Sequence, residues 1–266
     1  MTLKINYLDK KRGSSKNIAV FVYPNSKMDG FKGDFDVKIN QKILNLLSKN
    51  KDAKENKIFS LNQDFDEKII VLLLTKANNE LDFEKLGARF FDYLKKNEIS
   101  NVYINVKKLE TLNNKKTIFL NSFIHGAELK SYEFNLYKTK IKSKNINLFL
   151  NKLNISQKSK KMEAILGGVN LTRDLVSEPG NILHPDEYAK RILQLKKIGL
   201  KVTAYDKKKL KKMGCNALLG VGQGSIRGSY LVTMEWNGDK SNSKPLAFVG
   251  KGVCFDTGGI SLKPAK

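Results

Sequence analysis

Histidine and cysteine are both scarce in this chain, which contains two of each among its 266 residues. Two histidines are too few for a zinc site built from histidine. The cysteines, Cys215 and Cys254, form no CxxC pair, and two cysteines cannot build the disulfide framework of a small secreted protein. The scarcity of cysteine therefore favours a protein of the reducing cytosol.

Long apolar runs are missing as well. No stretch approaches the ~18 apolar residues that span a bilayer, and the N-terminus has no apolar core of signal-peptide length. We therefore expect a cytoplasmic protein that does not enter the membrane. The chain is long enough for two domains, or for one domain and a large part of another.

Acidic residues are outnumbered by basic ones, and arginine is rare among the basic residues. The formal net charge is +23, and the basic residues comprise 44 lysines and 5 arginines. The excess is spread along the chain, with a net charge of +11 in residues 1–150 and +12 in residues 151–266. Specific nucleic-acid sites usually rely on the planar fork of arginine. Non-specific binding of anions is expected, and a dedicated nucleic-acid partner stays open but is not favoured.

Short apolar runs alternate with helical patterns, which is typical of an α/β fold. The polar stretches around residues 138–144 and 154–161 separate an N-terminal α/β domain, residues 1–155, from a second domain, residues 156–266. In the first domain the pattern predicts strands at 18–23, 68–75 and 102–106, and helices at 39–47, 82–94 and 116–132. In the second it predicts helices at 162–175 and 186–198, and strands at 200–205, 230–236 and 246–249. Asp82 and Asp186 are the predicted N-caps of their helices.

The densest glycine cluster, VGKGVCFDTGGISLKPAK at residues 249–266, follows the last predicted strand. Ligand sites in α/β sheets lie at the carboxyl ends of strands, and glycines there let the backbone approach a ligand or metal closely. A surface turn with two lysines is the alternative. A phosphate-binding loop does not fit, because the spacing GxxxxGK[ST] is absent.

This glycine-rich segment is similar to the sequence that opens the active site of the leucyl aminopeptidase family, peptidase family M17. Three other stretches resemble the family in order and approximate spacing: YEFNLYKTK at 132–140, NLTRDLVSEPGNILHP at 170–185 and MGCNALLGVGQGS at 213–225. The resemblance implies a macro-like N-terminal α/β domain followed by the beginning of a mixed-sheet α/β metallopeptidase domain. It also implies a homo-hexameric enzyme that releases N-terminal amino acids, preferably leucine-like ones, from peptides with a free N-terminus.

The same resemblance assigns roles to three residues. Lys251 would be a metal ligand through its amine, Asp256 would bridge two divalent ions, manganese or zinc, and Lys263 would be catalytic and polarise the scissile carbonyl. Paired ions can activate a water for hydrolysis, and a dication favours the neutral amine that ligation by lysine requires. A lysine farther from the ions can stay charged and stabilise the oxyanion.

The remaining candidates are assigned structural roles: His125 within a helix, His184 in a turn before Pro185, and Cys254 as a small buried strand residue. The family's ligand set continues past Lys263 with another aspartate, an Asp-Ala-Glu motif and an arginine. The chain ends at Lys266 without them, so we expect it to be inactive alone. The alternative interpretation is a non-catalytic basic α/β binding module, which could bind DNA.

Overall fold

A computed structural model describes residues 3–9, 15–26, 34–63, 67–75, 79–107, 109, 115–139, 145–151, 159–239 and 244–254. The chain divides into two compact units, Met1–Arg173 and Asp174–Lys266, and each is described by itself. The domain boundary predicted between residues 155 and 156 lies outside the described residues. Within the described ranges, no helix combines the length and the apolar character needed to cross a bilayer.

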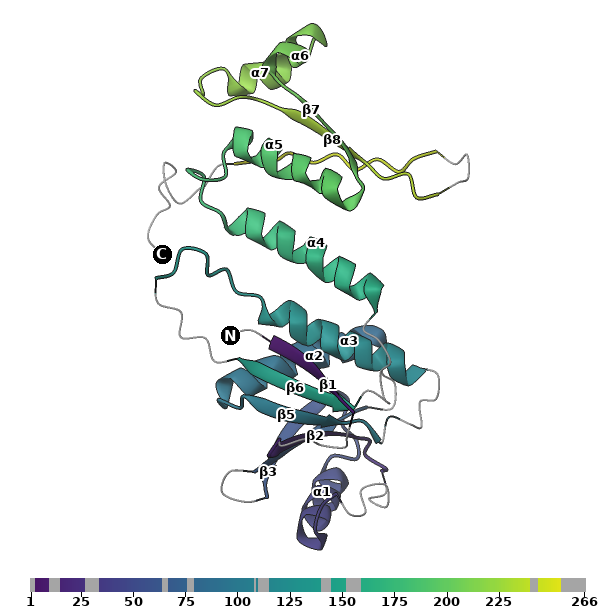
Figure 1. Ribbon diagram of the computed structural model, residues 1–266. Coiled ribbons are helices and arrows are strands. Elements are labelled where there is room, and N and C mark those ends of the chain that lie inside the picture. The colour runs from purple at the N-terminus through teal and green to yellow at the C-terminus, as the bar shows by residue number, and fades with distance from the viewer. Residues whose placement is uncertain are drawn as a thin grey trace. The chain divides into compact units, whose positions relative to one another are not determined.

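The first unit is built on a six-stranded sheet with the strand order β1-β6-β5-β2-β4-β3 (Figure 1). Neighbouring strands are parallel except for β3, which pairs antiparallel with β4. The strands are β1 Leu3–Leu8, β2 Asn17–Val22, β3 Lys57–Asn62, β4 Lys68–Leu73, β5 Asn101–Asn105 and β6 Ile146–Asn151. The helices are α1 Val37–Lys49, α2 Glu80–Lys96 and α3 Lys116–Ser131. This sheet confirms the predicted α/β fold.

Both faces of the sheet are apolar and both are covered. Successive side chains of a strand point to opposite faces, and along β2 Ile18, Val20 and Val22 belong to the core cluster that includes α1, whereas Ala19 and Phe21 belong to the cluster that includes α2 and α3. Figure 1 shows α1 on one side of the sheet and the α2–α3 pair on the other. A strand buried on both faces has a continuous run of apolar residues, and this run is why β2 and β4 could be predicted from the sequence.

Two glycines let α2 and α3 pack backbone against backbone. A Cβ placed on Gly87 of α2 would lie 1.8 Å from the Phe123 carbonyl oxygen, and one on Gly126 of α3 would lie 1.9 Å from the Glu84 carbonyl oxygen. Nine consecutive residues of α3, from Phe119 to Ala127, are buried, and the apolar ones among them share a core cluster with α2 and the sheet. Glycine inside a helix normally weakens it, but here it is what allows the two helices to meet.

The strongest apolar patterns were predicted correctly, and the less apolar strands were missed. The predicted helices at 39–47, 82–94 and 116–132 and the strands at 18–23, 68–75 and 102–106 are confirmed to within a few residues. Strands β1, β3 and β6 were missed because polar residues interrupt each of them. The N-cap of α2 is Asn79, not Asp82; the two residues form a reciprocal capping box in which each side chain accepts a hydrogen bond from the backbone N–H of the other at 3.0 Å.

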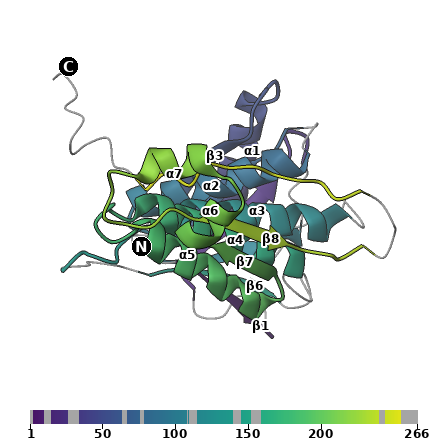
Figure 2. The ribbon, with the colours of Figure 1, turned by 90° about the horizontal axis from the view of Figure 1, so that it is seen from above.

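The second unit contains short elements. Helix α4, Lys160–Ser177, begins in the first unit and ends two residues before Pro179, as predicted. The elements that follow are α5 Pro185–Leu193, the 3-10 helix η4 Gln194–Ile198, β7 Lys201–Tyr205, α6 Lys207–Lys212, α7 Asn216–Gly222 and β8 Leu231–Glu235. β7 and β8 form an antiparallel pair and lie side by side in Figure 2. Gly199 ends η4 in the left-handed conformation, with φ 94°.

Three predictions for this unit are wrong. Residues 246–249 are not a strand: residues 244–254 are described without regular structure, and Phe248 and Val249 are 90% and 100% exposed. A strand needs a hydrogen-bonded neighbour, and no described strand pairs with this stretch. Cys254 is consequently half-buried outside any strand. The N-cap of α5 is His184, with Pro185 at the first helical position, so Asp186 lies inside the helix.

The glycine contact between α2 and α3 gives the first testable prediction. Gly126→Ala should lower the free energy of unfolding by about 1–3 kcal/mol, because its methyl group would overlap backbone atoms that cannot rotate away. Gly167→Ala is the matched control, since a Cβ there has no atom within 4 Å. It should raise stability by about 0.5–1 kcal/mol. Urea unfolding followed by circular dichroism measures both, and equal effects of the two variants would contradict the proposed packing.

Candidate functional site

Of the three residues with predicted site roles, only Lys251 lies in the described part of the chain; Asp256 and Lys263 lie outside the described residues. Lys251 is exposed and opens a tight turn in which the Val253 backbone N–H donates to the Lys251 carbonyl at 3.1 Å. Within the described ranges, no three His, Cys, Asp or Glu side chains lie close enough together to hold a metal ion. The roles of Lys251, Asp256 and Lys263 therefore stay predictions.

The donor chemistry of this segment nevertheless suits a divalent ion. Lys251 offers an amine and Asp256 a carboxylate, and both are donors that borderline divalent cations accept. Two donors are fewer than the four to six or more that such ions usually take. The remaining ligands would have to come from elsewhere.

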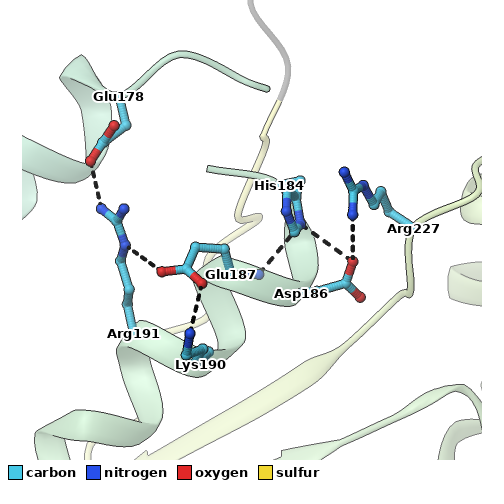
Figure 3. A network of polar contacts seen from close by, with 7 residues as sticks. All are labelled: Glu178, His184, Asp186, Glu187, Lys190, Arg191 and Arg227. Carbon is cyan, nitrogen blue, oxygen red and sulfur yellow. Dashed lines mark hydrogen bonds and ion pairs between the residues drawn. The ribbon is translucent and has the colours of Figure 1, made fainter. Parts of the chain in front are cut away.

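Helix α5 carries a network of polar contacts (Figure 3). Arg191 bridges two carboxylates: its Nη1 lies 2.8 Å from Glu178 Oε1, and its Nε lies 3.1 Å from Glu187 Oε1. The Glu178 side chain is only 2% exposed, so this carboxylate is buried with its charge paired. The Arg191–Glu178 ion pair connects the loop after α4 to one side of α5. The hydrogen bond from Arg191, aided by Lys190, holds the pKa of Glu187 below its ordinary value.

A second set of contacts surrounds Asp186 at the beginning of α5. Its Oδ1 accepts hydrogen bonds from the Tyr230 hydroxyl at 2.9 Å and from the Gly228 backbone N–H at 3.1 Å. Its Oδ2 lies 3.3 Å from His184 Nδ1 and 4.0 Å from Arg227 Nη1 (Figure 3). Burial acts to raise the pKa of Asp186, but these hydrogen bonds and nearby positive charges outweigh it and lower the pKa. Asp186 thereby joins α5 to the segment that leads into β8.

His184 takes part in both the helix cap and the Asp186 contacts. Its Nδ1 accepts a hydrogen bond from the Glu187 backbone N–H at 3.5 Å, which satisfies one free donor of the first helical turn. A nitrogen that accepts this bond carries no proton, so it cannot at the same time donate a hydrogen bond to Asp186. This supports the predicted structural role of His184.

The polar network joins one of the stretches that carry the family resemblance to the segment that follows another. Glu178 and His184 belong to residues 170–185, whereas Arg227 and Tyr230 directly follow residues 213–225. Of these residues, the sequence singled out only His184, as a structural residue. The Glu187–Arg191 pair could have been predicted from its i,i+4 spacing. The Arg191–Glu178 and Asp186–Tyr230 contacts join residues too far apart in the sequence for a local pattern to predict them.

The described residues form at least two clefts, and neither of these suggests a particular ligand. The larger, about 690 Å³, lies in the first unit and is lined by basic and acidic side chains together, including Lys54, Lys85, Arg89, Asp82 and Asp92. The smaller, about 270 Å³, lies in the second unit against the short helix α7, and Lys207 and Arg227 are among the residues that line it. The mixed charges of the first cleft and the small size of the second do not define a substrate.

The fold of this chain is similar to that of solved enzyme structures. A tomato leucine aminopeptidase mutant matches 88% of this chain and 50% of its own, with a TM-score of 0.66 and 20% identity. The bottromycin maturation enzyme BotP in complex with Mn matches 84% of this chain and 46% of its own, with a TM-score of 0.56 and 16% identity. At these identities the similarity shows the fold, and it agrees with the macro-like and metallopeptidase architecture expected from the sequence.

Sequence comparison identifies the family. Residues 19–141 match the N-terminal domain, and residues 170–266 the catalytic domain, of the cytosol aminopeptidase family, M17. A probable cytosol aminopeptidase of Phytoplasma australiense is 45% identical over 193 residues, which cover 70% of this chain and 38% of the relative. One from Rhizobium leguminosarum bv. trifolii is 40% identical over 210 residues, covering 75% of this chain and 42% of the relative. The chain belongs to the cytosol aminopeptidase family, and it spans about two fifths of the length of these relatives.

The Asp186 contacts predict a pH-dependent effect of Tyr230→Phe, which removes one hydrogen-bond donor. Because the folded-state pKa of Asp186 is lowered, its contacts stabilise the fold above the pH at which an unfolded aspartate titrates, about 4, and this is lost as the pH falls through the lower folded pKa. Tyr230→Phe should lower the thermal midpoint at pH 7, and its difference from wild type should shrink at about pH 3.

Tyr205→Phe is the control for Tyr230→Phe, since the described residues show no hydrogen bond to the Tyr205 hydroxyl. It should leave the thermal midpoint nearly unchanged at both pH values. A difference between Tyr230→Phe and wild type that stays constant on acidification would show that Asp186 is not the group that the Tyr230 hydroxyl stabilises.

Proposed function

We propose that this chain supplies the N-terminal domain and the opening segment of the active site to a metal-dependent cytosol aminopeptidase. The substrates would be peptides with a free N-terminus, from which the enzyme releases the first residue, preferably a leucine-like one. The observation that carries the proposal is the match of residues 170–266 to the family's catalytic domain, which includes the glycine-rich segment with Lys251, Asp256 and Lys263. The names of the relatives support a cytoplasmic location.

The proposed metal ligands are the Lys251 amine and the Asp256 carboxylate, which would hold two divalent ions, manganese or zinc, with further ligands from the rest of the domain. Such ions supply a water of lowered pKa and charge stabilisation of the oxyanion. The mutant tomato enzyme and the manganese-containing BotP share the fold, which is consistent with this assignment. The homo-hexamer inferred from the family resemblance belongs to the same proposal.

The two lysines would have opposite charge states. Lys251 coordinates only as a neutral amine, so metal binding at this residue must release a proton. Lys263 would stay protonated and donate to the oxygen of the scissile carbonyl as negative charge develops there. Their different distances from the ions would set this difference, since a nearby dication lowers the pKa of an amine.

A second candidate function is binding of a polyanion without catalysis. Between Gln194 and Tyr230 the chain has nine basic residues and one acidic residue, Asp206, and the exposed lysines of α6 follow directly after it. Such a surface attracts nucleic acid electrostatically. Affinity that falls steeply with salt and shows a sequence preference would favour this candidate, whereas metal-dependent release of leucine would favour the enzyme.

A chimera tests the proposed roles. This chain would be joined in frame to the downstream part of the Phytoplasma australiense relative, and leucine release and bound metal would be measured. We expect Asp256→Ala to abolish activity and Lys251→Ala to weaken metal binding. Lys263→Ala should lower kcat by about 100- to 1,000-fold with metal content unchanged. Wild-type metal content and rate in Asp256→Ala would reject the assignment, and metal loss in Lys263→Ala would show that ligand and catalyst are interchanged.

The 266-residue chain by itself should release no leucine from a leucyl substrate, even with excess manganese or zinc. Lys251 and Asp256 alone would leave each ion mostly with water ligands, and the affinity should be too low to hold two ions together. The measurement requires protein free of host aminopeptidase. Activity that follows this chain through purification and disappears in Asp256→Ala would contradict the expectation.

A further inference from the structure

Two glycines flank Lys251, and their surroundings differ. A Cβ placed on Gly250 has no atom within 4 Å, whereas one on Gly252 would lie 2.8 Å from Cε1 and 3.4 Å from Cδ1 of Tyr188. The Tyr188 ring on α5 therefore lies directly against the backbone of Gly252. Contacts below about 3 Å are not tolerated between carbon atoms, so this position has no room for a side chain while the ring stays in place.

The residue in contact with Tyr188 is the central one of the turn that carries Lys251. The Val253 backbone N–H donates to the Lys251 carbonyl at 3.1 Å, which closes the turn around Gly252. The Cys254 thiol lies 3.9 Å from the Gly252 carbonyl oxygen and is half-buried. The ring thus rests against a short closed segment, and a displacement of Gly252 would move its neighbours on both sides.

The helix that presents Tyr188 is itself held from two directions. Arg191, one turn after Tyr188, is bound to Glu178 and Glu187. Asp186, just before Tyr188, is bound to the Tyr230 hydroxyl and to the Gly228 backbone. The side chain that meets Gly252 therefore projects from a helix whose orientation is fixed by ion pairs and hydrogen bonds on either side of it.

We propose that Tyr188 is a positioning residue whose ring, packed against Gly252, fixes the turn that presents the Lys251 amine. The turn has no strand partner and no buried side chain of its own among residues 244–254, so the aromatic contact of Gly252 with Tyr188 contributes to its orientation. The contact itself is independent of the reaction; its consequence for metal binding rests on the proposed function.

The contact can be tested in the 266-residue chain through the reactivity of Cys254. In a Cys215→Ser background Cys254 is the only thiol of the chain, and its alkylation rate by iodoacetamide reports whether the turn is displaced. Gly252→Ala and Tyr188→Ala should each raise the rate about three- to tenfold, as expected for local opening of a lightly held segment. Gly250→Ala and Tyr188→Phe should match the parent chain, since neither disturbs the ring contact.

Non-additive effects of Tyr188→Ala and Gly252→Ala on the alkylation rate would show that these two residues contact each other. Once Tyr188→Ala has removed the ring, Gly252→Ala should add no further increase in the alkylation rate, because the new methyl group meets nothing. Fluorescence of Trp236, the only tryptophan, verifies that the second unit is folded in each variant. Equal rates for Gly250→Ala and Gly252→Ala, or independent increases from Tyr188→Ala and Gly252→Ala, would overturn the proposal.

The chimera then separates the positioning role from the proposed function. If the parent chimera releases leucine, Gly252→Ala should raise the manganese concentration needed for half-maximal activity, and Gly250→Ala and Tyr188→Phe should not. An unchanged metal requirement in Gly252→Ala would overturn the positioning of Lys251. A parent chimera that binds no metal and releases no leucine would contradict the proposed function. The alkylation rates would still test whether Tyr188 and Gly252 are in contact.

Discussion

Direct backbone contact between α2 and α3 at Gly87 and Gly126 sets the dimensions of the first unit. A parallel sheet with two apolar faces must be covered on both, and here one face is covered by a pair of helices that touch without intervening side chains. The close approach brings Phe123 of α3 within 5.1 Å of Phe21 on the sheet and within 5.3 Å of Phe90 on α2, measured between ring centroids. Without the two glycines the helices would have to separate, and the aromatic core below them would lose contacts.

The second unit is held together by polar contacts to a greater extent. Its buried apolar residues are few, Leu183, Ala189, Val202 and Leu210 among them, and α5 is instead fixed by the Arg191 ion pairs and the hydrogen bonds to Asp186. Ion pairs with partly exposed partners contribute modestly to stability, but they define orientation. The Tyr188 ring of α5 supports the turn that carries Lys251, so the orientation of α5 decides where this turn is held.

The two units also differ in their apolar cores. The first unit, which contains the match of residues 19–141 to the family's N-terminal domain, has a continuous core on both faces of its sheet. The second unit contains the match of residues 170–266 to the catalytic domain, and its described residues form no comparable core. The apolar stretch Leu246–Val249, predicted as a strand, is exposed and unpaired in the described part of the chain, because strand formation depends on a neighbour.

The sequence alone determined the α/β class, the family, and the apolar helices and strands of the first unit, because helical spacing and continuous burial are local properties; the apolar stretch at 246–249 shows that such a pattern does not make a strand without a neighbour. It also indicated the chemistry of Lys251, Asp256 and Lys263 through the family resemblance, which the described residues leave as a proposal. Only the tertiary structure showed why α3 contains Gly126, which residue caps α5, and that Tyr188 meets Gly252. The cap of α5 is a local contact of His184 with Glu187, and the neighbouring Asp186 was an equally plausible candidate by residue type. The other two features depend on contacts between residues distant in sequence, Gly126 with Glu84 and Tyr188 with Gly252, and no local pattern of residue types encodes such contacts.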